Sequence, residues 1–425
     1  MKNVFYSILI FFLSLFSEKT IAQSAPDMVA NPDIHGIVFS LSGNQLAYPI
    51  INLGAQNAVQ LDFDDFSGSV KNYYYTFVLC DADWQPVDDP SPNYLNGFSQ
   101  DRIPTYTISS YAKVNYIHYS ISLPQQNCMP TRSGNYLLKV FENGDPSQLA
   151  FSRRLLIENP RVAISAEVQQ PYDNEKTGTY QKVQFSINVA PLQLQSPQQQ
   201  LKVVVLQNFR WDNAVSGIQP AFMRGQVYEY NGERDLLFQA GKEYRRADLQ
   251  SFRYQSEFVK SIDVTQVPFV VEMKTDKSRM NEDYLPISDY DGFFNITTLE
   301  QIDPNTQGDY AWVHFTYVSD DGKPYADRDV YIVGQMNNYV YDDNSKLKFN
   351  PDKGYYETTL LLKQGYYNYM YVTKSADNPA PDFSLAEGNN WLTENNYTVL
   401  VYYQSFSDRA PQLVGVKTIS SQKQQ

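Results

Sequence analysis

The stretch YYETTLLLKQGYYNYMYVT, at residues 355–373, holds two strand-like runs that meet at Gly365. Successive side chains of a strand point to opposite faces, so Tyr367, Tyr369 and Tyr371 share one surface and the residues between them share the other. Tyrosine and β-branched residues in this alternation are typical of a half-buried antiparallel strand. The pattern predicts strands of a β-sandwich and argues against a helix.

The composition extends this interpretation to the whole chain. Its 425 residues include 34 tyrosines and 24 phenylalanines, hydrophobic residues make up 42%, and the mean hydropathy is −0.46. Such a mixture is expected of many half-buried antiparallel strands, and the length suits about three domains. The net charge of −13 repels phosphate backbones and anionic lipids. A nucleic-acid or membrane-surface role would need a local basic patch, which the sequence does not show.

The first residues have the features of a secretory signal peptide. Residues 1–22 combine a basic residue near the start, an apolar run at 4–16 and a small residue at Ala22. The apolar run is shorter than the ~18 residues that a membrane-spanning helix needs. We therefore expect cleavage between Ala22 and Gln23 and export of the mature chain out of the cytoplasm.

Strand and turn signals divide the mature chain into three blocks. Alternating runs such as YIHYSISLP are separated by the turn-forming segments PSPN, PTRSGN and ENGDPS, as in tandem β-sandwiches of the immunoglobulin or fibronectin type. We expect an N-terminal β-sandwich at 23–158, a middle β-sandwich at 160–303 with a polar and aromatic insertion at 211–254, and a C-terminal immunoglobulin-like β-sandwich at 304–412. Residues 413–425, with little to bury, are expected to form a flexible tail.

The chain has two cysteines, Cys80 and Cys128. An oxidising compartment permits a disulfide between them. Cys80 ends a strand-like run and Cys128 lies in a loop, so the sequence does not show whether the two thiols approach within bonding distance. A disulfide and two separate buried thiols both stay open.

The three histidines, His35, His118 and His314, are scattered along the chain. None lies beside a G-x-S-x-G elbow, and the H-E-x-x-H motif is absent. His118 and His314 lie inside strand-like runs, where a hydrogen-bonded structural histidine is the expected role. We predict no catalytic residue and no enzyme activity. Two carboxylates brought together from distant segments, as glycosidases use, stay open as an alternative.

Acidic residues cluster in three places: at Asp81, Asp83, Asp88 and Asp89, at Asp289 and Asp291, and at Asp320 and Asp321. The segment SDYDGFF contains only part of a calcium-binding loop. Asp and Asn side chains stabilise turns by hydrogen bonding to nearby backbone, so turns are the expected role. We expect no metal and no cofactor.

The aromatic strands also allow a platform on which sugar rings would stack. Tyr73, Tyr75 and Phe77 share a face of their strand, just as the three later tyrosines do. Cross-strand packing in the core of a sandwich explains both sets, so burial is the expected state of these rings.

Several segments together resemble one family, and they span nearly the whole mature chain: NYYYTFVLCDADWQP, NYLNGFSQDRIPTYTISSYAKVNYIHYSISLP, SGNYLLKVFENGDPSQLAFSRRLLI, LKVVVLQNFRWDNA, GKEYRRAD, LLLKQGYYNYMYV and TENNYTVLVYY. They are similar to the Plug protein family of the Bacteroidota type IX secretion system. The resemblance implies a periplasmic protein that binds the giant outer-membrane β-barrel translocon and closes its periplasmic opening when no cargo is passing. It implies no nucleic acid and no direct membrane insertion, and it identifies no barrel-binding residue.

A second resemblance covers the C-terminal block. The run DVYIVGQMNNYVYDDNSKLKFNPDKGYYETTL, with its G-x-x-N-x-aromatic turn, is similar to starch- and glycogen-binding immunoglobulin-like modules. Tyr339 stands where those modules usually have Trp, and their other ligand-stacking tryptophans have no match in this chain. A periplasmic or surface glycan-binding accessory protein is therefore the alternative function.

Overall fold

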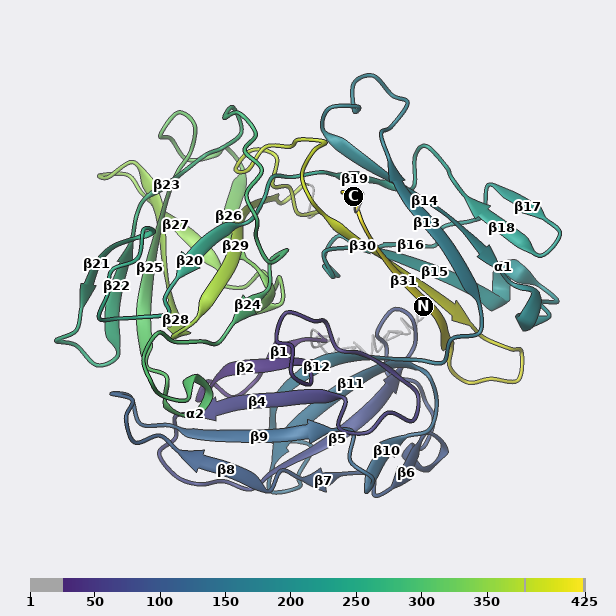
Figure 1. Ribbon diagram of the computed structural model, residues 1–425, viewed down its shortest axis with the longest axis horizontal. Helices are drawn as coiled ribbons and strands as arrows, with labels where there is room; N and C mark the ends of the chain where they lie inside the picture. The colour runs from purple at the N-terminus through teal and green to yellow at the C-terminus, as the bar shows by residue number, and fades with distance from the viewer. Residues whose placement is uncertain (1–25, 378–379, 423–425) are drawn as a thin grey trace, which may run out of the picture.

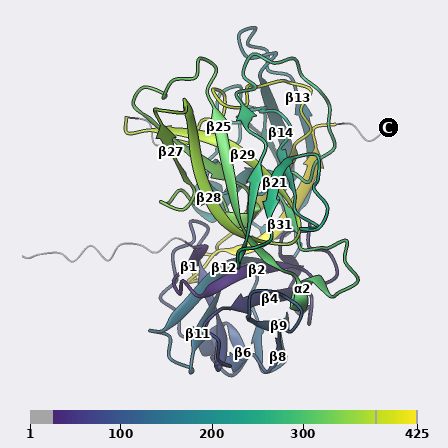
Figure 2. The same ribbon diagram turned by 90° about the vertical axis from the view of Figure 1, so that its left-hand side faces the viewer.

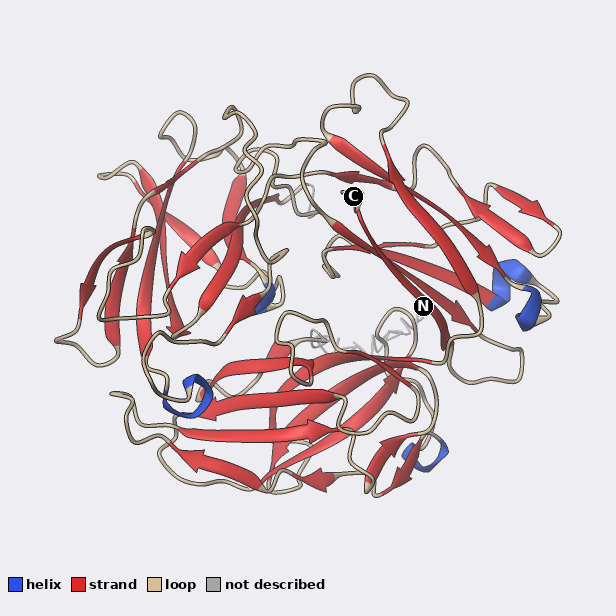
Figure 3. Cartoon of the chain, in the orientation of Figure 1, coloured by secondary structure: helices blue, strands red, loops and turns tan. Residues whose placement is uncertain are grey.

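The computed structural model of the protein describes residues 26–377 and 380–422. The predicted signal peptide and the cleavage site between Ala22 and Gln23 lie outside the described residues. Three β-sheet lobes form a triangle (Figures 1 and 3), so the prediction of an all-β chain of tandem sandwiches is confirmed. The described helices are single turns, none with the length and apolar character needed to span a bilayer: α1 (Pro197–Gln200), α2 (Pro304–Gln307) and the 3-10 helices Ser91–Asn93, Ala190–Leu192 and Gln335–Asn337.

The N-terminal lobe packs two sheets face to face. The first has the order β1-β12-β11-β5-β7, with β3 beside β12: β1 (Met28–Val29), β12 (Leu149–Glu158), β11 (Gly134–Glu142), β5 (Tyr73–Cys80), β7 (Asp101–Arg102) and β3 (Ile50–Asn52). The second has the order β2-β4-β9-β8: β2 (Ile34–Leu41), β4 (Val59–Asp65), β9 (Ile117–Leu123) and β8 (Thr105–Ile108). A separate pair is formed by β10 (Cys128–Pro130) and β6 (Leu95–Gly97).

Aromatic rings fill the core between these two sheets. Tyr73, Tyr75 and Phe77 are fully buried on the inner face of β5, as the alternation predicts. The Phe63 ring, from the facing sheet, lies 5.1 Å from the Tyr73 ring and 5.0 Å from the Phe151 ring, both edge-to-face. Such pairs add about 0.5–1.5 kcal/mol each beyond the burial of their area.

The middle lobe is also built from two sheets. One has the order β13-β14-β18-β17, with β19 beside β14: β13 (Ala163–Gln169), β14 (Tyr180–Asn188), β18 (Val227–Tyr230), β17 (Phe222–Arg224) and β19 (Leu237–Gln239). The other has the order β16-β15-β30-β31: β16 (Val215–Ser216), β15 (Leu201–Gln207), β30 (Asn396–Tyr403) and β31 (Gln412–Ser420). Strands of the insertion at 211–254 therefore contribute to both sheets.

The C-terminal end of the chain departs from the sequence prediction. β30 pairs antiparallel with β15 and β31 pairs with β30, so the end of the block expected at 304–412 completes the middle lobe. Residues of the expected tail at 413–425 form most of β31, in which Leu413 and Val414 are fully buried. The tail was predicted because few apolar side chains stand near the end of the chain. β31 is instead held mainly by backbone pairing with β30 and by a few buried side chains at its start.

The C-terminal lobe is one hydrogen-bonded array of ten strands that wraps around its core. Its order is β20-β29-β26-β27-β28-β25-β22-β21: β20 (Arg245–Asp248), β29 (Tyr366–Ser375), β26 (Arg328–Val333), β27 (Lys346–Asn350), β28 (Tyr355–Lys363), β25 (Tyr310–Val318), β22 (Phe269–Met273) and β21 (Val259–Asp263). Two short strands join its sides, β23 (Asp276–Lys277) on β25 and β24 (Phe294–Asn295) on β29.

The stretch at 355–373 supplies two strands that do not pair with each other. β28 pairs with β25 and β27, whereas β29 pairs with β20, β24 and β26, so the turn at Gly365 carries the chain between two parts of the array. A Cβ at Gly365 would lie 2.6 Å from the carbonyl oxygen of Asn295, so only glycine fits this close approach. Tyr367, Tyr369 and Tyr371 are buried on one face, as predicted.

The importance of β31 can be tested with one buried and one exposed side chain. Leu413 is fully buried where β31 meets the N-terminal lobe, and Lys417 on the same strand is exposed. Leu413→Ala should lower the free energy of unfolding by about 2–5 kcal/mol through lost burial and the cavity left behind. Lys417→Ala should change it by less than about 0.5 kcal/mol. Urea denaturation of the two variants checks this, and equal effects would mean that β31 is not packed as described.

Candidate interaction surface

Asp64 joins the N-terminal and C-terminal lobes. Its carboxylate, fully buried at the end of β4, accepts hydrogen bonds from Lys363 Nζ at 2.5 Å and from the Tyr310 hydroxyl at 2.5 Å, both in the C-terminal lobe. His118 Nδ1 of the neighbouring strand lies 2.7 Å from the same carboxylate. Gly36 has a positive φ and no side chain, and a Cβ there would overlap the Tyr310 hydroxyl. Figure 2 shows the two lobes meeting near α2.

The protonation of this group is set by burial and by its charged neighbours. Burial alone would raise the pKa of Asp64, but Lys363 and the hydrogen bond with His118 outweigh it and hold the pKa below its usual value. Burial lowers the pKa of His118, but hydrogen bonding to Asp62 and Asp64 outweighs burial and raises it to about 9. His118 is therefore a charged, hydrogen-bonded structural residue at neutral pH, which confirms the role predicted for it.

Of the other two histidines, His35 borders this group, with its ring centroid 6.4 Å from that of Tyr310, whereas His314 makes its contacts elsewhere on β25 and β28. His314 Nδ1 lies 3.1 Å from the Thr359 hydroxyl, so its predicted hydrogen-bonded role is also confirmed. The His35 ring packs against Phe66, with ring centroids 4.5 Å apart.

Arg154 joins the N-terminal and middle lobes. Its guanidinium lies 5.0 Å from the ring of Trp84 in its own lobe and 5.2 Å from the ring of Trp211 in the middle lobe. It forms an ion pair with Asp27. The indole N–H of Trp211 donates to the hydroxyl of Tyr48 at 2.8 Å, across the same junction. A desolvated cation between two indole rings favours this arrangement by about 2 kcal/mol.

Arg210 joins the middle and C-terminal lobes. It follows β15, is 1% exposed, and binds the Asp212 carboxylate through two nitrogens at 2.7 and 3.1 Å. Its guanidinium lies 5.0 Å from the Tyr339 ring and 5.3 Å from the Phe383 ring of the C-terminal lobe. The hydroxyl of Tyr341 donates to Asp212 at 2.6 Å. Each pair of lobes therefore shares a cation, fully buried at Lys363 and Arg210 and mostly buried at Arg154.

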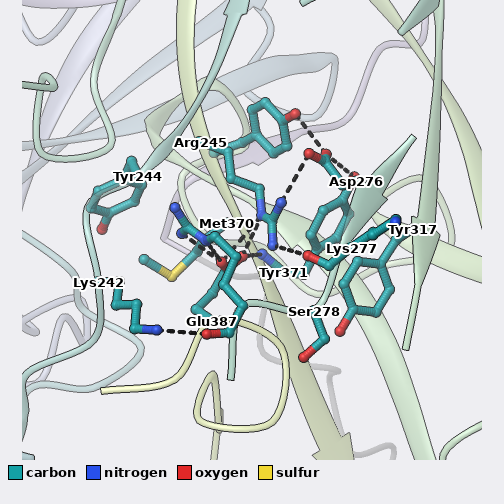
Figure 4. Close-up of polar contacts among 12 residues, drawn as sticks. Lys242, Tyr244, Arg245, Asp276, Lys277, Ser278, Tyr317, Met370, Tyr371 and Glu387 are labelled. Atoms are coloured by element: carbon teal, nitrogen blue, oxygen red, sulfur yellow. Dashed lines mark hydrogen bonds and ion pairs between the residues drawn. The ribbon is translucent and has the colours of Figure 1, made fainter. Parts of the chain in front are cut away.

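A fourth buried cation lies inside the C-terminal lobe (Figure 4). Arg245 Nε lies 3.0 and 3.1 Å from the two oxygens of Glu387, and its Nη1 lies 2.9 Å from Asp276. The hydroxyls of Tyr369 and Tyr371 donate to the other oxygen of Asp276 at 2.8 and 2.9 Å. Burial would raise the pKa of Glu387, but the guanidinium groups of Arg245 and another arginine lower it to about 2. The tyrosines that suggested a sugar platform are therefore fixed inside the lobe.

The acidic clusters form turns, as expected. The Asp81 side chain accepts two backbone N–H groups of its own turn at 2.8 and 2.9 Å. Asp289 accepts the N–H of Asp291 at 2.7 Å, and Asp321 accepts the N–H of Lys323 at 3.0 Å. Across the described residues, no group of three or more His, Cys, Asp or Glu side chains is arranged to hold a metal ion.

The two cysteines are free and buried. Cys128 packs in the core of the N-terminal lobe together with Phe77 and Leu79, whereas Cys80 faces the middle lobe from the opposite side of β5. Burial raises the pKa of each thiol to about 12, which keeps both protonated. Of the two alternatives left open by the sequence, the structure has separate buried thiols.

The exposed surface carries a groove between the N-terminal and C-terminal lobes, with a volume of about 770 Å³. We call it the two-lobe groove. Its lining comes from several short segments: Tyr111, Lys113, Phe252, Arg253, Gln255, Ile262, Val264, Phe269, Glu300, Ile302, Asp309 and Gln364. The volume lies within the ~300–1,000 Å³ typical of binding pockets, and the lining mixes apolar with charged side chains.

Large apolar side chains are exposed around this groove. Tyr111 is 74% exposed and Val264 55% exposed within the lining, and Ile108 on β8 is 60% exposed. β8 and β21 are the last strands of their sheets, so each presents an unpaired backbone edge. Exposed apolar groups next to free strand edges are typical of protein interaction sites. The sequence analysis named no residue of this groove, because no single segment contains enough of it to form a pattern.

Comparisons with known proteins match the N-terminal lobe and the fold of the whole chain. The family described as "Type 9 secretion system plug protein 1st domain" matches residues 34–159. The crystal structure of a hypothetical protein from Parabacteroides merdae is similar with a TM-score of 0.88 and 33% identity, covering 93% of this chain and 98% of that one. Among curated proteins no sequence matches.

The charge on His118 predicts a specific dependence of stability on pH. Its folded pKa of about 9 lies above the unfolded value of ~6.5, so its stabilising contribution is complete below pH 6.5 and is lost as the pH rises through 9. The difference in free energy of unfolding between wild type and His118→Gln should therefore fall, by on the order of 3 kcal/mol, between pH 6 and pH 10. Urea denaturation of both proteins across this range measures the difference. A difference that does not change with pH would contradict a folded pKa of about 9 for His118.

Proposed function

We propose that this chain, which belongs to the type 9 secretion system plug protein family, binds the giant outer-membrane β-barrel of that system and closes its periplasmic opening when no cargo is passing. Family membership associates the chain with type IX secretion and with the cell envelope. The proposal adds the periplasmic location, the barrel partner and the closing of the opening.

One observation carries the proposal: the three lobes are joined in a closed triangle by a buried or mostly buried cation at each junction. A plug has to occupy space without deforming, because a body with mobile domains would let solutes pass. Separating the N-terminal from the C-terminal lobe would take Lys363 away from Asp64, and removing a partner from a buried charge typically costs about 3–5 kcal/mol. Separating the middle lobe from either neighbour would expose Arg154 or Arg210, which keep their carboxylate partners but lose the aromatic rings of the other lobe. Joints of this kind support a single rigid body, whereas covalent linkers alone would permit relative motion.

The proposed function needs no catalytic residue. The burial of two carboxylates with lowered pKa values, Glu387 and Asp64, is consistent with a protein that has none. Glu387, whose pKa is lowered to about 2, is 1% exposed and held by arginines. Asp64 is also fully buried and bound by Lys363. A substrate could reach neither without opening the fold, so we propose that these groups are structural and that the protein is not an enzyme.

Glycan binding was suggested by aromatic rings on strands, and the structure does not leave these rings exposed to a ligand. Tyr367, Tyr369 and Tyr371 are buried in the C-terminal lobe, and Tyr339 is 4% exposed beneath the Arg210 guanidinium. Rings in these positions offer no face to a sugar.

Closure of the barrel predicts a permeability change that depends on the barrel. Deleting the gene for this chain should make the outer membrane leak small dyes, because the periplasmic opening would stay unblocked. Deleting the barrel gene as well should remove the leak. Dye uptake in the single and double deletion strains measures both effects, with the wild-type gene restored on a plasmid as the control. Unchanged dye uptake in the single deletion would contradict the proposed function.

A further inference from the structure

The two-lobe groove is held open by contacts that belong to both lobes. The side-chain oxygen of Gln307 at the end of α2 accepts the backbone N–H groups of Ser110 and Tyr111, at 2.8 and 3.0 Å. The Asp309 carboxylate accepts the N–H of Lys113. The N-terminal wall of the groove is therefore fixed to the C-terminal lobe, and the cavity is a permanent feature of the folded chain.

The charged side chains of the groove differ in the hydrogen bonds and ion pairs that they form within the protein. Glu300 accepts hydrogen bonds from the side chains of Ser251 at 2.7 Å and Gln364 at 3.0 Å, and it is only partly exposed. In the described part of the chain, no ion pair or side-chain hydrogen bond is formed by the heads of Lys113 and Arg253, both of which are exposed. The lining thus carries two cations at its rim, Lys113 and Arg253, whose heads form no ion pair, and two carboxylates, Glu300 and Asp309, that accept hydrogen bonds within the protein. The Asp309 carboxylate is near enough to both cations to interact with their charge.

The apolar part of the lining lies beside these cations. Phe252 and Phe269 pack edge-to-face with centroids 5.6 Å apart, and Tyr111 and Val264 remain exposed. β21 ends the hydrogen-bonded array, and the Gln255 side chain donates to the carbonyls of Val259 and Lys260 at its start. The rest of its outer edge can pair with one more extended strand. An occupant that satisfies all three features is extended, has an apolar side chain and carries a carboxylate close to it.

We propose that the two-lobe groove binds an extended segment of the partner in which an aliphatic or aromatic side chain lies next to a carboxylate. The apolar side chain fills the space lined by Phe252 and Phe269, and the carboxylate pairs with Lys113 and Arg253. This inference rests on the proposed function, because it assigns the segment to the outer-membrane barrel. An interface with an apolar centre and a charged rim suits a complex that forms and is released. The charged rim mainly affects the rate of association, and the apolar centre stabilises the complex once it has formed.

Charge reversal at the rim tests the inference. Tagged mature chain should retain the barrel from detergent-solubilised outer membranes, and Lys113→Glu/Arg253→Glu should retain at least tenfold less. The control pair, Lys348→Glu/Lys417→Glu, reverses two exposed lysines outside the groove, one on β27 of the C-terminal lobe and one on β31 of the middle lobe, and should retain as much as wild type. Circular dichroism and the urea midpoint of each variant check that it is folded.

The outcomes separate this inference from the proposed function. If wild type retains no barrel, the proposed function fails and the groove inference falls with it. If wild type and both pairs of variants retain the barrel equally, the groove inference alone is overturned. If the control pair loses as much barrel as the groove pair, the effect is one of total charge and the groove inference is again overturned.

A photocrosslinker identifies the occupant directly. Replacing Tyr111 with benzoylphenylalanine in the full chain should, on illumination in outer membranes, give an adduct with the barrel. Mass spectrometry of the adduct should locate the crosslink in a segment with a carboxylate next to an apolar residue. A crosslink to a second copy of this chain, a crosslink to a barrel segment without a carboxylate, or no adduct at all would each overturn the inference.

Discussion

Buried positive charge at the junctions between lobes is the constraint on which the rest of this structure depends. Lys363 enters the N-terminal lobe to bind Asp64, Arg154 lies between indole rings of two lobes, and Arg210 lies beneath aromatic rings of the C-terminal lobe. A buried ion pair adds little to stability over a well-packed apolar contact, but breaking it is costly. These junctions therefore contribute less to folding itself than to the fixed relative positions of the lobes.

That fixed geometry connects the fold to the proposed function. The chain closes its triangle by returning β30 and β31 to the middle lobe, and β31 packs against the N-terminal lobe. The returning chain end and the cations at the junctions thus both hold the three lobes in fixed relative positions. Asp64 is used at a junction between lobes, and Glu387, Tyr369 and Tyr371 are used inside the C-terminal lobe. What remains available to a partner is the outer surface, and the two-lobe groove is its largest concave feature among the described cavities.

Local features of the fold were predictable from the sequence, and long-range pairings were not. The buried faces of β5 and β29 follow from alternation of side chains at a period of two residues. The same alternation could have shown that Cys80 faces away from the core, because Phe77 and Leu79 face into it. The position of Cys128 depends on a turn whose geometry no local pattern gives.

The contact between Asp64 and Lys363 joins residues 299 apart in sequence, and the pairing of β15 with β30 is similarly remote. The groove lining is spread over too many short segments to leave a motif.

Unfolding of the mature chain in urea tests the rigid triangle most directly. Tryptophan fluorescence reports on Trp84 and Trp211 at the junction of the N-terminal and middle lobes, together with Trp312 and Trp391 elsewhere. Far-ultraviolet circular dichroism reports on the sheets of all three lobes. Chains of several domains commonly unfold in separate steps. If the buried cations join the lobes into one body, both signals should change in a single transition with the same midpoint. Two or more transitions, with fluorescence and circular dichroism changing at different urea concentrations, would contradict the account.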